Sequence, residues 1–348
     1  MNNRKLKILR AVIDEYILTG EPVGSKKIAM LPEINVSAAT VRNDMAILEQ
    51  LGLLEQPHTS AGRIPTFSGF KVYIDTISAE KRALSEEEKR RLDEMLNINN
   101  VHTEDVIIQN ATTALAEITK CATVASNATP KFSIITKVEI IPTGKRLYVI
   151  LLITSSGNVK NKACRLEFDL DQSQLEFFSR YVQENLHGVS VESLSDEMFQ
   201  NLVTSLGAYI VTLSPLIEGI YELSKDLRNE EITLSGEKNL LNRDDLDKNE
   251  IIRFIENKNN VLSLIDKSFE GIKVIFSDEK DSFIIGNSSL IVSKYQKGDK
   301  EAGSLGIIGP MRLDYTKIIP YLEYFTQKIT DLISEDDDYS RKDDNRSD

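Results

Sequence analysis

The stretch from Val36 to Arg63 constrains this chain more than any other, because its pattern predicts a helix followed by a tight hairpin. Ser37 is a suitable N-cap, since its hydroxyl can accept a hydrogen bond from a free N–H of the first turn. Gly52 suits the left-handed position that ends a helix. Apolar residues recur between them at helical spacing and define a buried stripe of Val41, Met45, Leu48 and Leu51.

The opposite face of the predicted helix carries side chains that suit a DNA groove. Ala39 and Ala46 are small enough for a close approach, and the amides of Asn43 and Gln50 can each pair bidentately with adenine. Arg42, on the flank of this face, can contact guanine or a phosphate. A plain solvated helix face can have the same composition, so the helix alone leaves both interpretations open.

The neighbouring segments predict a helix-turn-helix. Apolar residues recur at helical spacing over residues 4–18, and Ser25 is a suitable N-cap for a short helix that ends at Met30. A tight turn then leads into the helix that begins at Ser37, and a fourth helical pattern covers residues 66–79. Three helices with a tight turn before the third form the helix-turn-helix arrangement.

A wing is predicted at residues 53–65, as a short strand, a loop with Pro and Gly, and a return strand. Small side chains and N–H groups of this loop can contact phosphates, and Arg63, expected at its tip, can neutralise one or enter the minor groove. An ordinary exposed hairpin is the alternative. The joint pattern favours a winged-helix DNA-binding domain over residues 1–79. Its predicted DNA-contacting residues are Ser37, Ala39, Thr40, Arg42, Asn43, Ala46, Gln50, His58, Thr59, Ser60 and Arg63.

Charge is distributed unevenly along the chain. The 348 residues carry a net charge of −12, yet the first 75 hold nine Lys or Arg and eight Asp or Glu, a net charge of +1. The remainder therefore carries −13. A nearly neutral module on an acidic body predicts that affinity for DNA comes from a paired arrangement of modules rather than from one basic patch.

The rest of the chain predicts an α+β body. A charge-rich segment with a capping-box pattern at Ser85 predicts an exposed helical linker over residues 80–102. A helix is expected at residues 103–120. Three strands of an antiparallel meander follow within residues 132–168. Strand patterns return late in the chain, at residues 231–234, 271–276, 282–293 and 304–308, before a last helix at residues 315–333.

The pattern between the two groups of strands is helical, over residues 171–228. One α+β domain whose sheet is completed by distant segments, with this helical block inserted, explains the order of elements. The wide apolar face of the block needs a partner. A homodimer interface and the domain's own sheet are both open as that partner. The acidic residues 335–348 are expected to be a disordered tail.

The sequence contains no recognisable active site. Its three histidines and two cysteines lack the spacing of metal ligands, and there is no nucleophile-elbow or Walker sequence, so no catalytic residue, metal or cofactor is predicted. The glycine-rich segment 303–310 is either a strand with a close backbone approach or the edge of a small-ligand pocket. An apolar run long enough to span a membrane is absent, and charge begins too early for a signal peptide, so we expect a cytoplasmic protein without a membrane partner.

Four strings of residues resemble the HrcA family of bacterial heat-inducible transcription repressors. Residues 37–46, SAATVRNDMA, and residues 57–66, PHTSAGRIPT, carry the DNA-binding signature. Residues 122–130 and 306–315 resemble later segments of the same family. Two mild departures are Phe70-Lys71 where Tyr-Arg is expected and Met311 where Thr is expected, and the acidic tail is not part of the family pattern.

The resemblance implies a dimeric repressor of chaperone operons that binds an inverted-repeat operator in double-stranded DNA. It implies a GroE-type chaperonin as a partner that keeps the repressor folded until heat diverts it. The implied organisation is a winged-helix domain at 1–79, a helical linker at 80–102, a GAF-like domain at 103–170 and 229–334, a dimerising insertion at 171–228 and the tail at 335–348. A homodimer matches an inverted repeat, because the two-fold symmetry of the protein mirrors that of the operator.

Three other functions remain open from the sequence. The GAF-like domain could sense a small ligand and make the chain a metabolite-responsive regulator. The chain could be an enzyme with an accessory DNA-binding module, although it shows no catalytic constellation. The three-helix module could bind protein rather than DNA.

Overall fold

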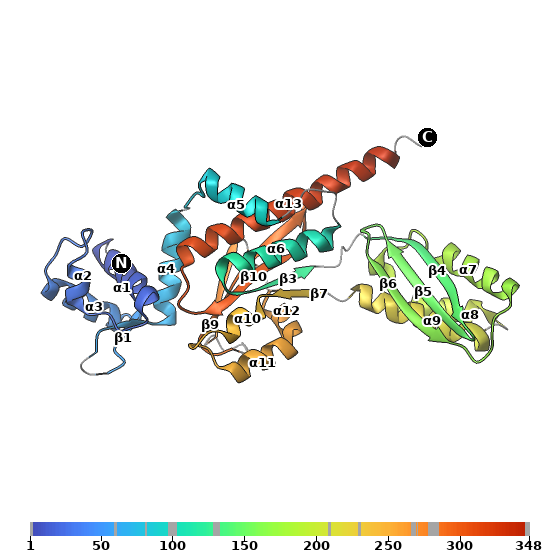
Figure 1. Ribbon diagram of the computed structural model, residues 1–348, viewed down its shortest axis with the longest axis horizontal. Coiled ribbons are helices and arrows are strands. Elements are labelled where there is room, and N and C mark those ends of the chain that lie inside the picture. Colours follow the sequence, from blue (N-terminus) through green and yellow to red (C-terminus); the bar gives the residue numbers. More distant parts are fainter. Residues whose placement is uncertain are drawn as a thin grey trace.

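The structure is a computed structural model, which describes residues 3–58, 61–80, 82–96, 103–127, 133–207, 210–228, 231–265, 269, 271–277 and 285–344. It has three parts, seen from left to right in Figure 1. We call them the head (residues 3–80), the body (residues 82–127 and 231–344) and the lobe (residues 133–228).

The head has the predicted winged-helix order of elements. They are α1 (Asn3–Thr19), α2 (Ser25–Ala29), α3 (Ala38–Gln50), β1 (Leu54–Glu55), β2 (Ile64–Pro65) and α4 (Phe67–Glu80). Strands β1 and β2 pair antiparallel. Ser37 caps α3 as predicted, whereas Ser25 lies inside α2 and Gly24 takes the N-cap position. Leu51 was expected in the buried stripe but is 57% exposed, because α3 ends at Gln50.

The predicted linker is part of the body. Helix α5 (Glu86–Leu96) has the expected capping box, in which Glu88 accepts from the N–H of Ser85 and donates its own N–H to the Ser85 hydroxyl. The charged face of this helix is exposed as expected, but Leu92 and Leu96 are buried in the core shared with the next helix, α6 (Glu104–Thr119), so the segment packs on the body rather than forming a free linker. The apolar side chains at these two positions explain the packing.

The body is built around a five-stranded antiparallel sheet in the order β7-β3-β10-β9-β8. Its strands are β3 (Ala122–Asn127), β7 (Glu231–Ser235), β8 (Ile272–Phe276), β9 (Ser288–Lys297) and β10 (Lys300–Pro310). Strand β3 was missed from the sequence, because its small residues lack the bulky alternation that marks a strand. Distant segments do form this sheet, but the early strand that pairs with the late ones is β3 and not the predicted meander.

Helices cover both faces of this sheet (Figure 1). Helices α6 and α13 (Tyr315–Asp344) pack on one face. The other face is covered by α10 (Glu237–Leu241), α11 (Lys248–Glu256) and α12 (Leu262–Ile265), none of which the sequence pattern predicted. Such layers are compatible with the GAF-like body that the family resemblance implies.

Helix α13 is longer than predicted. The sequence pattern placed its end at residue 333 and a disordered tail after it, but the helix continues to Asp344. No glycine or proline interrupts residues 334–344, and a helix that is already formed extends at low cost. Residues 345–348 lie outside the described part of the chain.

The lobe corrects the predicted domain boundaries. The meander strands β4 (Ile135–Gly144), β5 (Leu147–Thr154) and β6 (Val159–Arg165) form a separate three-stranded sheet and do not join the sheet of the body. The inserted segment therefore begins after Asn127 rather than at residue 171, and it ends at β7.

The lobe has its own core. Its sheet packs against α7 (Gln172–Leu186), α8 (Asp196–Ser205) and α9 (Ile210–Arg228). The alternating side chains of β5 supply one face of this core, and the wide apolar face of the helical block supplies the other. The sequence left two partners open for that helical face, a second copy of the chain and the domain's own sheet. In the structure the helical face packs against the sheet of the lobe itself.

Candidate nucleic-acid interface

Helix α3 exposes the face that the sequence predicted. The side chains of Ser37, Ala39, Arg42, Asn43 and Gln50 are exposed, and those of Thr40 and Ala46 are partly so, while the stripe of Val41, Met45 and Leu48 is buried. Among the described residues, the side chains of Arg42 and Asn43 have no hydrogen-bond or ion-pair partner. They are therefore available to a ligand that lies along this helix.

The first turn of α3 is fixed by its own hydroxyl groups. The Ser37 Oγ accepts from the N–H of Thr40 at 3.2 Å and lies 2.9 Å from the Thr40 hydroxyl. Capping of this kind keeps the N-terminal turn regular. In helix-turn-helix proteins the N-terminal residues of the recognition helix contact base edges. A regular backbone in this turn therefore matters for the placement of those side chains.

The buried side of α3 is tied to α1 by an ion pair that sequence reasoning missed. Arg4 donates from Nε and Nη2 to the two carboxylate oxygens of Asp44, at 2.7 and 3.2 Å. Asp44 is only 2% exposed, and its hydrogen bond raises the pKa of the Arg4 guanidinium. The signal was an acidic residue placed within the apolar stripe of α3, which requires a buried partner.

The wing is anchored at its base on the segment between α1 and α2. Val23 and Arg63 exchange both backbone hydrogen bonds at 2.9 Å. A Cβ atom on Gly62 would lie 2.4 Å from the carbonyl oxygen of Val23, so this approach requires glycine. Gln56 Nε2 donates to the carbonyl of Ala61 at 3.1 Å and closes the loop. His58 is exposed, and the predicted contacts Thr59 and Ser60 lie outside the described residues.

Arg63 does not lie at the tip of the wing, where it was predicted. It lies at the base, and its Nη2 and Nε approach Glu49 Oε2 of α3 at 2.8 and 3.0 Å. Arg63 forms an isolated antiparallel β-bridge with Val23, and its side chain extends from there to Glu49 of α3. Contact with a phosphate would therefore require Arg63 to exchange one anionic partner for another.

Helix α2 adds a candidate that the sequence did not single out. Lys26 and Lys27 are exposed on it, and Lys27 forms an ion pair with Glu15 of α1. In helix-turn-helix proteins the helix before the recognition helix crosses the DNA backbone, where lysines bind phosphates. The sequence signal for this candidate was the position of both lysines in the short helix directly before the tight turn.

The glycine-rich segment 303–310 lies in the central strand β10. Tyr295 crosses over this strand and donates to the carbonyl of Ser126 at 2.8 Å. A Cβ atom on Gly303 would lie 2.3 Å from the hydroxyl oxygen of Tyr295 and 2.1 Å from the Ser126 carbonyl oxygen. Close backbone approach, one of the two interpretations left open, is the reason for this glycine.

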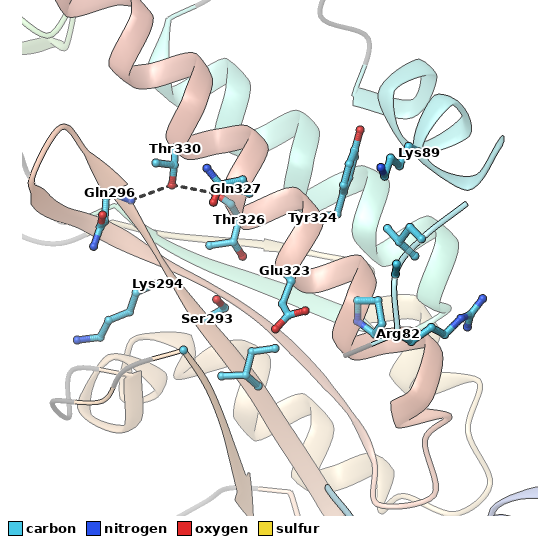
Figure 2. Close-up of a pocket in the computed structure, with 15 residues that line it drawn as sticks. Arg82, Lys89, Ser293, Lys294, Gln296, Glu323, Tyr324, Thr326, Gln327 and Thr330 are labelled. Carbon is cyan, nitrogen blue, oxygen red and sulfur yellow. Dashed lines mark hydrogen bonds between the residues drawn. The ribbon is translucent and has the colours of Figure 1, made fainter. Parts of the chain in front are cut away.

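The body has an open groove of about 640 Å³ between α13, the β8–β9 pair and the segment before α5 (Figure 2). Polar groups from α13 and β9 line it, including Glu323, Gln327 and Ser293, and Arg82 and Lys89 approach from the α5 side. Thr330 accepts from the N–H of Gln296 at 3.0 Å. The groove holds charges of both signs, so it does not define one class of ligand.

No helix in the described ranges is both long enough and apolar enough to cross a membrane.

Comparison with known proteins gives the same assignment for both ends of the chain. The profile described as the HrcA DNA-binding winged helix-turn-helix transcription repressor matches residues 2–78, and that of the HrcA C-terminal domain matches residues 105–319. A crystal structure described only as that of a hypothetical protein has a TM-score of 0.66 at 24% identity, over 96% of this chain and 99% of that chain, which supports the fold alone.

Full-length relatives carry one shared name, heat-inducible transcription repressor HrcA. The protein from Ruminiclostridium cellulolyticum is 33% identical over 342 residues, which cover 96% of this chain and 97% of the relative. That from Clostridium perfringens strain 13 is 30% identical over 337 residues, which cover 96% and 99%. These relatives are repressors rather than enzymes, so an enzyme with an accessory DNA-binding module is not supported. The exposed α3 face thus lies on a winged-helix DNA-binding domain, and the chain belongs to the HrcA family of heat-inducible transcription repressors.

Proposed function

We propose that this chain is a sequence-specific repressor of heat-shock chaperone operons, which binds an inverted-repeat operator as a homodimer in the cytoplasm. The observation that carries the proposal is the exposed face of α3, with Arg42 and Asn43 unpaired among the described residues. The first 75 residues have a net charge of only +1. One such head attracts DNA weakly, so two heads related by a two-fold axis would supply the affinity and match an inverted repeat.

In this proposal the contacts divide into two classes. Side chains along α3 contact bases, and those at its start and in the wing hold the sugar-phosphate backbone. The residues proposed for bases are Ala39, Asn43, Ala46 and Gln50, with Arg42 at a base edge or a phosphate. The residues proposed for the backbone are Ser37, Thr40, His58, Thr59, Ser60 and Arg63.

The homodimer would form through the lobe, on the side of its sheet that α7, α8 and α9 leave uncovered. The centre of this open face is a row of apolar β5 side chains that alternate with the core, Leu147, Val149, Leu151 and Ile153. The residues paired with them on the two edge strands are Lys137, Glu139 and Ile141 of β4 and Val159, Asn161, Ala163 and Arg165 of β6. Val159 is 52% and Ile141 is 37% exposed. An apolar row with polar and charged residues along its rim favours association with a second copy of the same face.

The response to heat is the part of the proposal that rests on the family. A GroE-type chaperonin would keep the repressor active, and its diversion to damaged proteins during heat stress would release the operator. Operator binding by the purified protein should be measured across temperature, with and without chaperonin. Chaperonin-independent binding at heat-shock temperatures would contradict this mechanism while leaving DNA binding intact.

Gel-shift titration with Arg42→Ala and Asn43→Ala tests the DNA contacts. Loss of a bidentate base contact should raise the Kd for the operator by about ten- to a hundredfold. Because neither side chain has a partner among the described residues, the fold should be unaffected. Lys71→Ala, an exposed position on α4, is the control that removes one positive charge from the head. Wild-type affinity in both α3 variants would overturn the assignment.

A small-ligand-responsive regulator is the second candidate, and the groove in Figure 2 is the observation that favours it. Thermal-shift screening of the full chain against metabolites separates the two. A specific stabiliser whose effect is lost in Gln327→Ala would favour a sensor that uses this groove.

A further inference from the structure

Aromatic side chains join the head to the body. The ring centroid of Phe70 in α4 lies 6.1 Å from Phe276 of β8 and 6.1 Å from Tyr315, the first residue of α13. Tyr73 of α4 lies 6.5 Å from Tyr315, and its hydroxyl donates to Asp14 of α1 at 2.5 Å. Phe70, Phe276 and Tyr315 are at most 1% exposed. Apolar burial holds the two parts together, but it is not directional and does not by itself fix their orientation.

A directional contact lies at the end of α1. Gly20 closes this helix in the left-handed conformation, with φ of +72°, and its N–H donates to the carbonyl of Tyr16 at 2.8 Å. A Cβ atom on Gly20 would lie 2.2 Å from Nη1 and 2.9 Å from Cζ of Arg312. The guanidinium of this body residue therefore packs directly on the glycine backbone of the head.

Arg312 is itself held in place. It lies in the turn between β10 and α13, where its Nη2 donates to Asp245 Oδ2 at 3.1 Å. Its side chain is 29% exposed and that of Asp245 is 19% exposed. The neighbouring N–H of Met311 donates to the carbonyl of Asn287 at 3.0 Å and fixes the backbone of the turn. The guanidinium thus bonds the body with one nitrogen and contacts the head with another.

A movement of α1 would be transmitted to the DNA-contacting helix. Arg4 of α1 donates two hydrogen bonds to the buried carboxylate of Asp44 in α3. The two helices therefore move as one unit, and the contact at Gly20 sets the direction in which the body presents α3.

We propose that Arg312 is a positioning residue for operator binding, which fixes the orientation of each head on the body. The inference rests on the proposed dimeric function. Linked heads gain affinity only when both half-sites can be engaged at once, and the gain disappears when the geometry is wrong. Fixed heads select one separation of half-sites, whereas heads that rotate accept several separations and hold each of them less firmly.

The test uses full-length protein and duplexes that the wild-type protein selects from random sequence. Three probes are compared: the selected inverted repeat, one half of it, and the repeat with half a helical turn inserted between its halves. Arg312→Ala should leave the Kd for the single half unchanged and weaken binding to the intact repeat by about tenfold. The insertion should cost this variant less affinity than it costs wild type. Asp245→Asn, which preserves the shape of the side chain, should reproduce this pattern with smaller changes: an unchanged Kd for the single half, weaker binding to the intact repeat and a smaller penalty for the insertion.

Lys317→Ala is the matched control. It removes one positive charge from α13, at a side chain that is 59% exposed and whose ion-pair partner among the described residues is Asp314. Equal losses by Arg312→Ala on the half and on the intact repeat would overturn the inference, because they indicate a direct or a folding role. An unchanged penalty for the insertion would overturn it as well. If wild type selects no repeat, or binds the repeat no better than its half, the proposed dimeric function fails and this inference fails with it.

Discussion

At the scale of single residues, the pair of Arg63 and Glu49 sets the charge that the base of the wing presents. The two side chains lie 2.8 Å apart, and both are partly exposed. A phosphate that approaches Arg63 meets a cation already neutralised by a carboxylate, and it is also repelled by that carboxylate. The sequence could predict the arginine but not this partner, because the two residues are 14 positions apart and meet only when the wing folds against α3.

Glu49→Gln should therefore strengthen DNA binding. Release of Arg63 toward a phosphate is expected to lower the Kd for duplex DNA roughly threefold at physiological salt and to steepen the plot of log K against log salt by about 0.9. Fluorescence-anisotropy titrations at several salt concentrations measure both quantities. In the Arg63→Ala background the same substitution should no longer steepen the plot. An unchanged slope in the single variant would show that Arg63 does not reach the DNA.

Gly69 is a second residue whose role depends on a tertiary contact. It lies inside α4, where a Cβ atom would come 2.1 Å from the carbonyl oxygen of Leu53. Alanine raises helix propensity by about 1 kcal/mol, but a clash with backbone costs about 1–3 kcal/mol. Gly69→Ala should therefore lower the free energy of unfolding in urea. Ser68→Ala, at the exposed neighbouring position, gains helix propensity without the clash and should not lower the free energy of unfolding.

At the scale of elements, strand β5 shows what a pattern determines and what it leaves open. The run from Leu147 to Thr154 between two predicted turns predicted the strand, and the structure confirms it. The same run did not reveal which of its faces is buried or which sheet the strand joins, because nearly all of its residues are apolar. The core around Ile150 is completed by helices of the next 80 residues, so nearby packing, not the distant sheet, determined the location of β5.

Leu151→Lys tests the open face as the dimer interface. Leu151 alternates with the core residues Ile150 and Leu152, so a lysine there projects from the uncovered side and leaves the core intact. Two lysines facing each other across a two-fold axis repel, and the variant should sediment as a monomer at concentrations where wild type is a dimer. Ser173→Lys places the same charge on exposed α7 and should remain dimeric. A dimeric Leu151→Lys would show that another surface joins the two copies.

At the scale of the whole molecule, the lobe is inserted at the end of a hairpin. Asn127, the last residue of β3, pairs directly with Glu231, the first residue of β7. The chain thus leaves and re-enters the body at adjacent points, and the sheet of the body does not depend on the lobe for its register. The sequence predicted an insertion but not this geometry, because β3 has too few bulky residues to be recognised as a strand.

Replacement of residues 128–230 by Asn-Gly should leave a folded head and body. A two-residue turn of this type joins adjacent antiparallel strands without strain. We expect cooperative unfolding by circular dichroism, a monomer by sedimentation, and an affinity for a single half-site equal to that of wild type. The gain in affinity from the second half-site should be lost. A shortened chain that remains dimeric would place the main interface on the body.

The contact between Arg63 and Glu49 also has a consequence for competition within a genome. Every bacterial chromosome offers millions of non-specific sites, and the occupancy of one operator depends on the ratio between specific and non-specific affinity. If Arg63 stays paired with Glu49 on unrelated DNA, the head offers one free positive charge fewer, which would lower its non-specific affinity. Fewer copies of such a protein would then be held on unrelated DNA, and the occupancy of an operator would follow the number of active copies more closely.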